Sequence, residues 1–390
     1  MDALTTPSNW QRVRLGDMTT SFTKQTGFDY SASIKPTLIK EQLPNYIPFI
    51  QNKDFSGHYI NYKTDYFIPN EIAIRFPQIL LNEKCLLISI SGAIGNVAVF
   101  NHSQDAFIGG AIAVLKFKEK KSLDFVMHFL MSASGQKLLL NGVKSSSHKN
   151  LTIADLRDLL IPLPPLDEQI AIANILSDVD RYLYSLRALI LKKESVKKAL
   201  SFELLSQRKR LKGFNQTWQK VRLGDIANYL TSNLSAEQIT QQGKIKVYDV
   251  NNFIGYTNTT FISDKPYISI VKDGSVGRVR ILPPKTNILS TMGALVANHK
   301  TTTEFLFYLL SNFDFKNFTS GSIIPHIYFK DYKEKTIFLP PLNEQIAIAN
   351  ILSALDNEII SLKNKKRQFE NIKKALNHDL MSAKIRVLKK

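Results

Sequence analysis

A stretch of fifteen residues occurs twice in this chain and constrains its fold more than any other feature. Residues 163–177 read LPPLDEQIAIANILS, and residues 339–353 differ from them only in having Asn343 in place of Asp167. The two copies lie 176 positions apart, and the same offset continues without a gap into the residues that follow. Self-similarity at a fixed offset indicates that the chain is built from two copies of one structural unit.

The start of each half is repeated as well. The segment WQRVRLGD begins at Trp10, and the similar segment WQKVRLGD begins at Trp218. Because tryptophan buries a large apolar surface, we expect both residues to anchor the cores of two globular segments. Each copy is therefore predicted to hold a globular segment followed by a helix, and the copies are expected to be related by a pseudo-two-fold axis.

The repeated stretch has the features of a helix start. A proline fits the first turn, and Glu168 and Glu344 then meet the positive end of the helix dipole. Apolar residues follow at steps of three and four in both copies, at Leu176, Val179, Leu183, Leu186, Ile190, Leu352, Leu355, Ile359 and Leu362. Without an interrupting glycine or proline, each helix can reach roughly 40 residues, or about 60 Å. So narrow an apolar stripe requires a partner, and we expect the two helices to pair antiparallel as a coiled coil.

The globular segments are predicted to be α+β domains of one plan. In the first, strands are expected at 46–50, 85–90 and 97–100, and a helix at 123–131. In the second, a turn at 272–278 takes the place of the turn at 91–96. The expected domains are a globular domain, a helix, a second globular domain and a second helix, at 1–162, 163–212, 213–338 and 339–390.

The net charge is +18, and it is spread along the chain. Each globular segment and each helical segment carries four or five more basic than acidic residues. A molecule that is positive along its length suits a polyanion, and DNA first. The alternative explanation is that the charge serves solubility or an acidic protein partner.

The only cysteine, Cys85, lies in an apolar run. It excludes an internal disulfide and a cysteine zinc cluster, and it fits a reducing compartment. No apolar stretch reaches the length of a membrane span, and the first residues lack the pattern of a signal peptide. We therefore expect a cytoplasmic protein without a membrane partner.

Two diverged globular regions, each closed by LPPLxEQxxIAxxL and a long helix, resemble the specificity (S) subunit of a type I restriction–modification enzyme. The resemblance covers essentially the whole chain. It implies that each globular part is a target recognition domain that reads one half of a split, asymmetric site in double-stranded DNA. It also implies that the helices act as a spacer and dock two methyltransferase (M) subunits.

The resemblance further implies that catalysis belongs to the partners. M subunits methylate adenine with S-adenosylmethionine, and restriction/translocase (R) subunits use ATP and Mg, so no cofactor is expected in this chain. The expected partner-binding residues are those of the repeated motif, namely Leu163, Pro164, Pro165, Glu168, Gln169, Leu339, Pro340, Pro341, Glu344 and Gln345.

The candidate DNA contacts lie in polar loops. Lys, Arg, Ser and His donate hydrogen bonds to phosphates, and Lys or Arg also reads guanine edges. The candidates are Lys144, Ser145, Ser146, Ser147, His148 and Lys149 in the first domain, and Lys272, Arg278, Arg280, Ser320, Ser322 and His326 in the second. Ordinary solvated turns remain the alternative interpretation of these loops.

The chain itself shows no sign of catalysis. It lacks the NPPF or DPPY motif of an N6-adenine methyltransferase and the phosphate loop of an NTPase. Gly92, Gly95, Gly274 and Gly277 lie outside any convincing strand–loop–helix unit, so we interpret them as turn glycines. The histidines lack metal-ligand spacing. Two alternatives to a specificity subunit stay open: a freestanding sequence-specific DNA-binding regulator and a structural coiled-coil adaptor.

Overall fold

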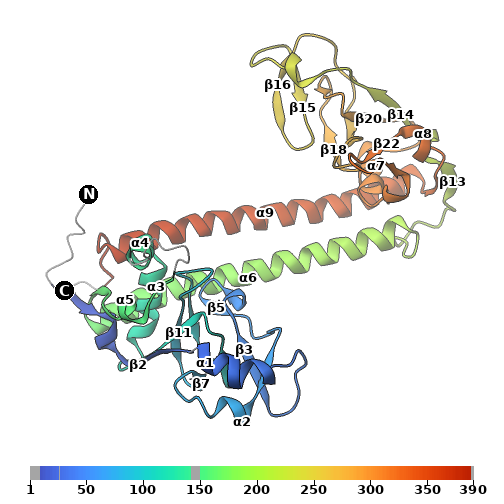
Figure 1. Ribbon diagram of the computed structural model, residues 1–390. Coiled ribbons are helices and arrows are strands. Elements are labelled where there is room, and N and C mark those ends of the chain that lie inside the picture. The colour runs from blue at the N-terminus through green and yellow to red at the C-terminus, as the bar shows by residue number, and fades with distance from the viewer. Residues whose placement is uncertain (1–8, 26, 142–149, 388–390) are drawn as a thin grey trace. The chain divides into compact units, whose positions relative to one another are not determined.

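The computed structural model describes residues 9–25, 27–141 and 150–387 of the chain. The chain divides into two compact units, of which the first comprises residues 1–185 and 366–390 and the second residues 186–365. Each unit holds one globular domain and segments of two long helices (Figure 1). These compact units divide each long helix, so the expected boundaries between globular and helical residues stay a prediction.

The first domain contains two four-stranded sheets. The strand orders are β2-β11-β8-β9, which is antiparallel, and β6-β3-β10-β7, which contains the parallel pair β3–β10. The predicted strands at 46–50 and 97–100 are β3 and β9, and the strand predicted at 85–90 is β8, one residue shorter. The bounds are β2 (Thr19–Lys24), β3 (Tyr46–Ile50), β6 (Phe67–Pro69), β7 (Leu80–Leu81), β8 (Cys85–Ser89), β9 (Val97–Phe100), β10 (Ala106–Ile108) and β11 (Ile112–Phe117).

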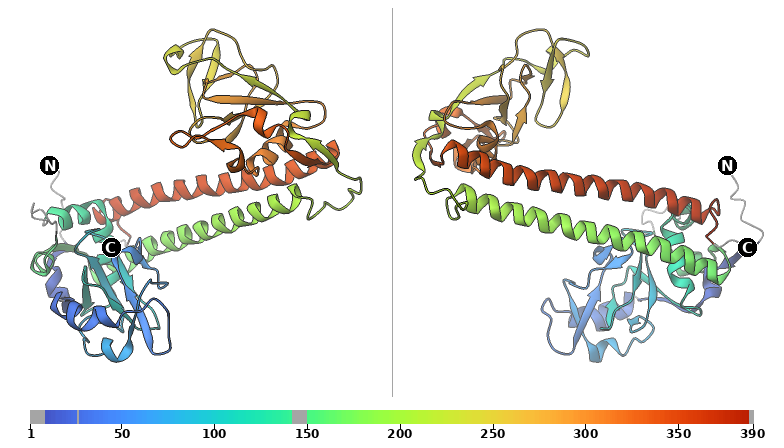
Figure 2. Two further views of the ribbon diagram at one scale, coloured as in Figure 1. Left: turned by 45° about the vertical axis from the view of Figure 1, so that its right-hand side comes forward. Right: turned by 180° about the vertical axis from the view of Figure 1, so that it is seen from behind.

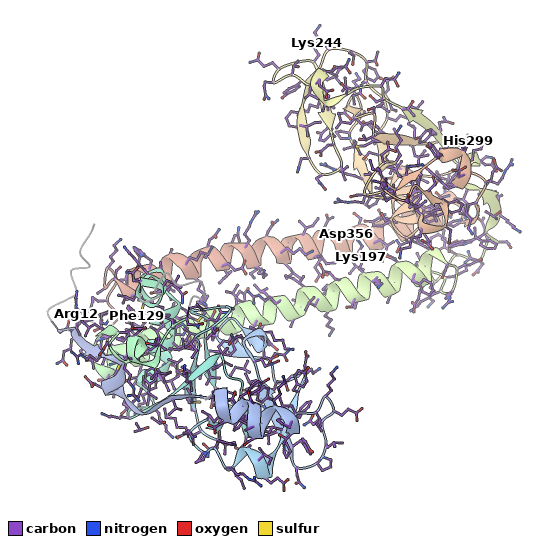
Figure 3. The ribbon with its side chains drawn as sticks, in the orientation of Figure 1. Arg12, Phe129, Lys197, Lys244, His299 and Asp356 are labelled. Atoms are coloured by element: carbon purple, nitrogen blue, oxygen red, sulfur yellow. The ribbon has the colours of Figure 1, made fainter. Side chains whose placement is uncertain are left out.

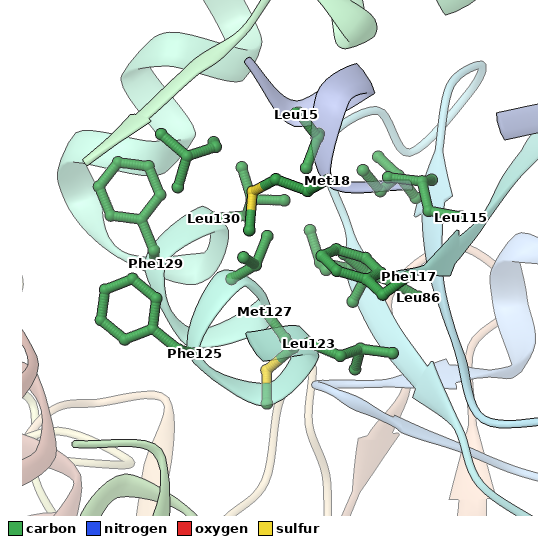
Figure 4. Packing of buried hydrophobic residues seen from close by; sticks show 14 of the residues in the cluster. Leu15, Met18, Leu86, Leu115, Phe117, Leu123, Phe125, Met127, Phe129 and Leu130 are labelled. Atoms are coloured by element: carbon green, nitrogen blue, oxygen red, sulfur yellow. The ribbon is translucent and has the colours of Figure 1, made fainter. Parts of the chain in front are cut away.

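Helices of the first domain pack on the antiparallel sheet. The predicted helix at 123–131 is α3 (Ser122–Met131), and a second helix, α4 (Ala133–Asn141), follows after a break at Ser132. Figure 4 shows Leu123 and Leu130 of α3 together with Met18 and Phe117 in the core. The shorter elements of this domain are β4 (Phe55–Ser56), β5 (Tyr59–Ile60), α1 (Gly27–Asp29), α2 (Asn70–Ala73) and α5 (Ile153–Arg157).

The second domain repeats this plan with fewer strands. Its antiparallel sheet has the order β14-β20-β17-β18, and its second sheet, β16-β15-β19, again holds a parallel pair, β15–β19. The strands are β14 (Ala227–Thr231), β15 (Ile245–Tyr248), β16 (Phe253–Thr257), β17 (Tyr267–Val271), β18 (Val279–Leu282), β19 (Asn287–Ile288) and β20 (Met292–Ala297). The helices are α7 (Thr303–Ser311), which corresponds to α3, and the short α8 (Phe329–Tyr332).

A two-stranded ribbon closes each domain onto its long helix. β1 (Gln11–Arg14) pairs antiparallel with β12 (Leu160–Leu163), and β13 (Gln219–Arg222) pairs in the same register with β23 (Thr336–Leu339). Trp10 and Trp218 precede these ribbons and are both buried in hydrophobic clusters, which confirms their predicted role as core anchors.

The two long helices have the predicted length. They are α6 (Leu166–Leu205) and α9 (Leu342–Met381), each of 40 residues. In the first unit the rings of Tyr182 and Phe369 lie 4.6 Å apart between centroids, and in the second Lys193 donates to Glu358 at 2.9 Å. Within each unit the two helix segments therefore lie side by side and run in opposite directions (Figure 2). The expected antiparallel pairing and the α+β fold class are confirmed.

Candidate nucleic-acid interface

A glycine turn of one geometry is present in both domains. In the first domain it joins β8 to β9, and the Gly95 amide donates to the Ser89 carbonyl at 3.0 Å. In the second it joins β17 to β18, and the Gly277 amide donates to the Val271 carbonyl at 2.9 Å. The φ angles of the four glycines, which include Gly92 and Gly274, lie between 71° and 86°. That left-handed region favours glycine, so the interpretation as turn glycines is confirmed.

In the first domain, the chain that follows the polar loop is attached to this turn. The Leu151 amide donates to the Ile90 carbonyl at 2.9 Å, and Asn150 pairs with Ser91 in an isolated bridge. The candidate contacts of this loop, Lys144, Ser145, Ser146, Ser147, His148 and Lys149, lie outside the described residues. The described residue that follows them, Asn150, therefore fixes where the loop rejoins the domain.

In the second domain the same attachment brings the predicted contacts together. The Ile327 amide donates to the Lys272 carbonyl at 2.9 Å, and His326 pairs with Asp273 in an isolated bridge. These two pairs correspond to Leu151 with Ile90 and Asn150 with Ser91 in the first domain. We call the surface formed by the turn 272–278 and the segment 319–327 the second-domain rim.

A short hairpin forms one side of the second-domain rim. It consists of β21 (Thr319–Ser320) and β22 (His326–Ile327). Ser320 and Ser322 are exposed, whereas the His326 ring is half-buried, with Nδ1 3.1 Å from the Ile324 carbonyl oxygen. The hairpin thus presents hydroxyl groups and one imidazole beside the glycine turn.

The two arginines predicted to contact DNA differ in how firmly their side chains are held by the domain. Arg278 is exposed, and its Nη2 donates to the Asn251 side-chain oxygen at 2.8 Å. Arg280 is half-buried, donates to the Asn251 carbonyl at 2.9 Å, and holds its guanidinium 5.3 Å from the centre of the Tyr248 ring. Arg280 is therefore tied to its own domain more firmly than Arg278, and Arg278 is the better placed of the two to reach a phosphate or base.

The glutamate of the second repeated motif is buried rather than displayed. Glu344 is fully buried, and its carboxylate accepts two hydrogen bonds from Arg210, at 2.6 and 3.2 Å, and one from Trp218 Nε1 at 2.9 Å. Arg210 follows α6, so this ion pair joins the chain after one long helix to the start of the other. Glu344 therefore stabilises this junction from within.

The first motif has the corresponding ion pair. Glu168 is buried and accepts from Arg386 at 2.7 and 3.0 Å. Both partners lie 176 positions from their counterparts Arg210 and Glu344, so the offset of the sequence repeat is also the offset of this contact. The two copies differ at the tryptophan: among the described residues, the indole N–H of Trp10 has no hydrogen-bond acceptor, whereas that of Trp218 donates to Glu344.

The glutamines of the two motifs are also used internally. Gln169 Nε2 donates to the Pro164 carbonyl at 2.7 Å, and Gln345 Nε2 donates to the Pro340 carbonyl at 2.8 Å. Both glutamine side chains are buried, so the motif folds back on the start of its own helix. The expectation that these side chains bind a partner directly stays a prediction. The side chains of Leu339 and Pro340 are buried as well.

Apolar side chains around the second motif remain exposed. They belong to Phe338, Leu342 and Ile346. Leu342 also lines a hollow of about 470 Å³, whose other lining residues are Gln216, Thr217, Gln219, His299, Lys300, Leu339, Pro340 and Pro341 (Figure 3 labels His299). A protein partner can reach these residues without opening the ion pair of Glu344.

One ion pair between the two long helices also occurs in both copies. Asp180 forms an ion pair with Lys373, and at the same offset Asp356 forms one with Lys197 (Figure 3). In the second unit Tyr308 donates to Asp356 at 2.9 Å, and burial raises the pKa of this phenol.

The first unit has a histidine in the position of Tyr308. His128 Nε2 lies 3.1 Å from the hydroxyl of Ser177, and burial, followed by the neighbouring His58 and Lys373, lowers the pKa of His128 to about 3. The ring is therefore neutral at pH 7 and belongs to the core. A DNA-facing role for His128 is excluded by its burial.

No group of three or more His, Cys, Asp or Glu side chains suited to a metal ion occurs within residues 9–25, 27–141 and 150–387. Over the same residues, every helix is too short or too polar to cross a membrane. Cys85 is a free thiol in the core, and burial raises its pKa to about 12.

Comparison with known proteins identifies both halves of the chain. The family model described as "Type I restriction modification DNA specificity domain" matches residues 7–194 and 215–371. A type I restriction enzyme specificity subunit, MjaVIII of Methanocaldococcus jannaschii, is 24% identical over 99% of this chain and 95% of its own length. A second protein of that organism, the putative MjaX specificity subunit, is 30% identical over 75% of this chain and 76% of its own length.

A solved structure has the same fold. The type I restriction–modification S subunit from M. genitalium aligns with a TM-score of 0.64 at 20% identity, over 95% of this chain and 96% of the other. The family model covers most of the chain in two matches, and these correspond to the two copies of the sequence repeat. The chain therefore belongs to the family of type I restriction–modification DNA specificity subunits.

Proposed function

We propose that this chain is the DNA-recognition subunit of a type I restriction–modification complex, and that each globular domain reads one half of a bipartite, asymmetric DNA site. The observation that carries the proposal is a glycine turn of the same backbone geometry that bears different side chains in the two domains. The glycine turn keeps its geometry in both domains, while its side chains differ, with Asn96 in the position of Arg278 and Ile90 in that of Lys272. A constant backbone frame that carries different side chains in the two domains suits two readers of different sequences.

In the second domain we assign DNA contact to the second-domain rim. Lys272, Arg278, Ser320, Ser322 and His326 come together there, and their donors suit phosphates and the edges of bases in the major groove. Arg280 then has a supporting role, because it fixes Asn251 beside Arg278. For the first domain, the corresponding contacts stay assigned to residues 144–149.

The helices serve in this proposal as a spacer and as the docking site of two M subunits. For docking we favour the exposed side chains of Phe338, Leu342 and Ile346 over the buried Glu344 and Gln345. Exposed apolar side chains near a hollow suit a protein interface. The buried residues of the motif would then act indirectly, by fixing the helix start that presents this surface.

Catalysis is assigned to the partner subunits, which would supply S-adenosylmethionine, ATP and Mg chemistry. A specificity subunit needs only to bind DNA and its partners, and no catalytic role is assigned to any residue of this chain. The lone, buried Cys85 is compatible with a reducing, cytoplasmic location.

The proposal is tested by titrating duplex DNA into the chain alone and into the chain co-purified with its M subunit, each at two salt concentrations. Because basic residues release counterions, the isolated chain should bind any duplex weakly and with a steep salt dependence. Sequence-specific binding should appear with the M subunit, which extrudes the target adenine from the stack. Strong discrimination by the chain alone would favour a freestanding regulator, and no binding to duplex DNA would favour an adaptor.

Single substitutions refine this test. Arg278→Ala should weaken binding of the complex and reduce its salt dependence or its discrimination at one position. Arg222→Ala is the matched control, because Arg222 is an exposed arginine of the same unit whose charge is already paired with Asp225 and Glu334. Equal effects of the two substitutions would remove the assignment of Arg278 to the interface.

A further inference from the structure

Two isoleucines stand out from the second-domain rim into solvent. Ile323 is 92% exposed and Ile324 is 62% exposed, at the tip between β21 and β22. Among the exposed large apolar side chains of the described residues, Ile323 is the most exposed. Singly exposed apolar side chains are common, but two neighbouring isoleucines at one tip gain nothing in folding from their exposure, and such a surface suits a ligand.

The tip is held in place by the backbone around it. Gly321 has φ +89°, and a Cβ there would lie 2.3 Å from the Ile324 carbonyl oxygen, so only glycine fits. The carbonyl of Pro325 accepts a hydrogen bond from the Gly274 amide at 2.8 Å. The isoleucine pair is therefore presented by a turn that is anchored to the glycine turn of the rim.

The support beneath the tip is aromatic and tightly packed. A Cβ on Gly277 would lie 2.6 Å from the Phe315 ring, so the glycine turn rests directly on that side chain. Phe315 is buried and makes an edge contact with Tyr332, with ring centroids 5.3 Å apart. The base of the hairpin is thus continuous with the core of the domain.

The surroundings of the tip are basic and polar. Lys272 and the exposed Arg278 lie on the adjoining turn, and the exposed Lys330 lies 5.4 Å from the centre of the Tyr328 ring, just after the hairpin. Asp273 in the same turn is the acidic residue bridged to the hairpin, and an aliphatic tip flanked by Lys272, Arg278 and Lys330 still suits DNA better than a neutral protein groove. The rim attracts phosphates, and the tip then meets the bases.

The major groove of DNA presents one apolar group, the C5-methyl of thymine, and its width admits a two-stranded β-ribbon. We propose that Ile323 and Ile324 enter the major groove and contact the methyl group of at least one thymine. The half-site read by the second domain then contains a T·A pair that faces the tip. This inference rests on the proposed function, and it names two specificity-determining residues that are absent from the predicted set.

The test uses a double-mutant cycle between protein and DNA. After adenine-methylation mapping has given the site, the complex with its M subunit is titrated with the natural duplex and with duplexes in which single thymines of that half-site are replaced by deoxyuridine. Loss of one buried methyl contact should weaken binding by about fourfold, which corresponds to about 0.8 kcal/mol. Ile324→Ser and Ile323→Ser should each weaken binding to the natural duplex by at least as much.

The decisive result is non-additivity. One of the two isoleucines contacts the thymine methyl group. In the serine variant of that isoleucine, replacement of the thymine by deoxyuridine should not weaken binding further, because the partner of the methyl group is already gone. Ile74→Ser is the matched control, since Ile74 is a 57% exposed isoleucine of the first unit. This control should keep the full deoxyuridine effect in the second half-site.

The other outcomes each exclude the inference. If deoxyuridine is tolerated at every position while the serine variants lose binding and DNA bending, the tip is a wedge between bases rather than a reader of methyl groups. If the serine variants lose the M subunit but keep their DNA preference, the tip binds protein. If the wild-type complex shows no specific site at all, the proposed function fails, and the thymine contact that rests on it fails with it; the first two outcomes leave the proposed function standing.

Discussion

The buried carboxylate of Glu344 offers a prediction whose size follows from a comparison within one chain. Glu344→Ala removes a bidentate ion pair with Arg210, whose side chain is 26% exposed, and also the acceptor of the Trp218 indole N–H. Removing one partner of a buried ion pair costs about 3 kcal/mol at the low end of the measured range. The orphaned indole N–H adds about 1.5 kcal/mol. We therefore expect the free energy of unfolding of the second unit to fall by about 4–5 kcal/mol.

Glu168→Ala should cost less in the first unit. It removes the corresponding pair with Arg386, whose side chain is 37% exposed and regains water more easily. It leaves the indole N–H of Trp10 unchanged, because that group has no acceptor among the described residues. We expect the free energy of unfolding of the first unit to fall by about 2–3 kcal/mol, so the two substitutions should differ by about 2 kcal/mol.

The assay uses the two tryptophans of the chain, one in each unit. Urea unfolding is followed by fluorescence, with Trp10→Phe as the background for Glu344→Ala and Trp218→Phe as the background for Glu168→Ala. With a slope of about 2 kcal/mol per molar urea, the midpoints should fall by about 2 M and about 1 M. Glu334→Ala, at an exposed ion pair, should shift the midpoint little. Equal midpoint shifts for Glu344→Ala and Glu168→Ala would refute this reasoning.

Three further predictions concern the helices and the buried histidine. Leu186→Asp buries a charge in the helix seam and should lower the melting temperature followed by circular dichroism, whereas Leu191→Asp, at an exposed position of the same helix, should not; equal melting temperatures would contradict the seam. Four residues inserted at matched points of α6 and α9 should lengthen the gap between methylated half-sites by sequencing and leave both half-sites unchanged; altered half-sites would contradict a spacer. The pKa of His128 is lowered on folding, so the unfolded chain binds the extra proton and stability is lost as pH falls from about 6.5 to about 3. His128→Tyr, which copies Tyr308, should flatten that part of the urea-midpoint profile; an unchanged profile would assign it to another group.

The features that depend on local pattern could be predicted from the sequence. An uninterrupted apolar stripe defined both long helices at their observed length, and alternation with turn glycines defined β3 and β9 at their observed bounds. The break between α3 and α4 could not be seen in this way. It depends on Gly135, where a Cβ would lie 2.0 Å from the Phe129 carbonyl oxygen, and that proximity exists only in the folded chain.

The candidate site was predictable only in part, because its assembly also depends on contacts that exist only in the folded chain. The basic and hydroxyl residues of the second-domain rim were visible as chemistry, but their assembly depends on backbone hydrogen bonds between segments about fifty residues apart. Ile323 and Ile324 carried a signal that polarity arguments pass over, namely an apolar pair before a proline inside a polar loop. The burial of Glu344 was hidden as well, because a glutamate at a helix start is ordinarily explained by the helix dipole alone.

Independent reading of DNA by the two domains is tested by adenine-methylation mapping of a domain exchange. Residues 214–338 are replaced by the equivalent segment of another specificity subunit, and methylated adenines are mapped genome-wide in cells that also make the M subunit. We expect one half of the methylated site to change while the other half and the gap between them stay as they were. A change in both halves would contradict it, because the domains would then read the DNA jointly.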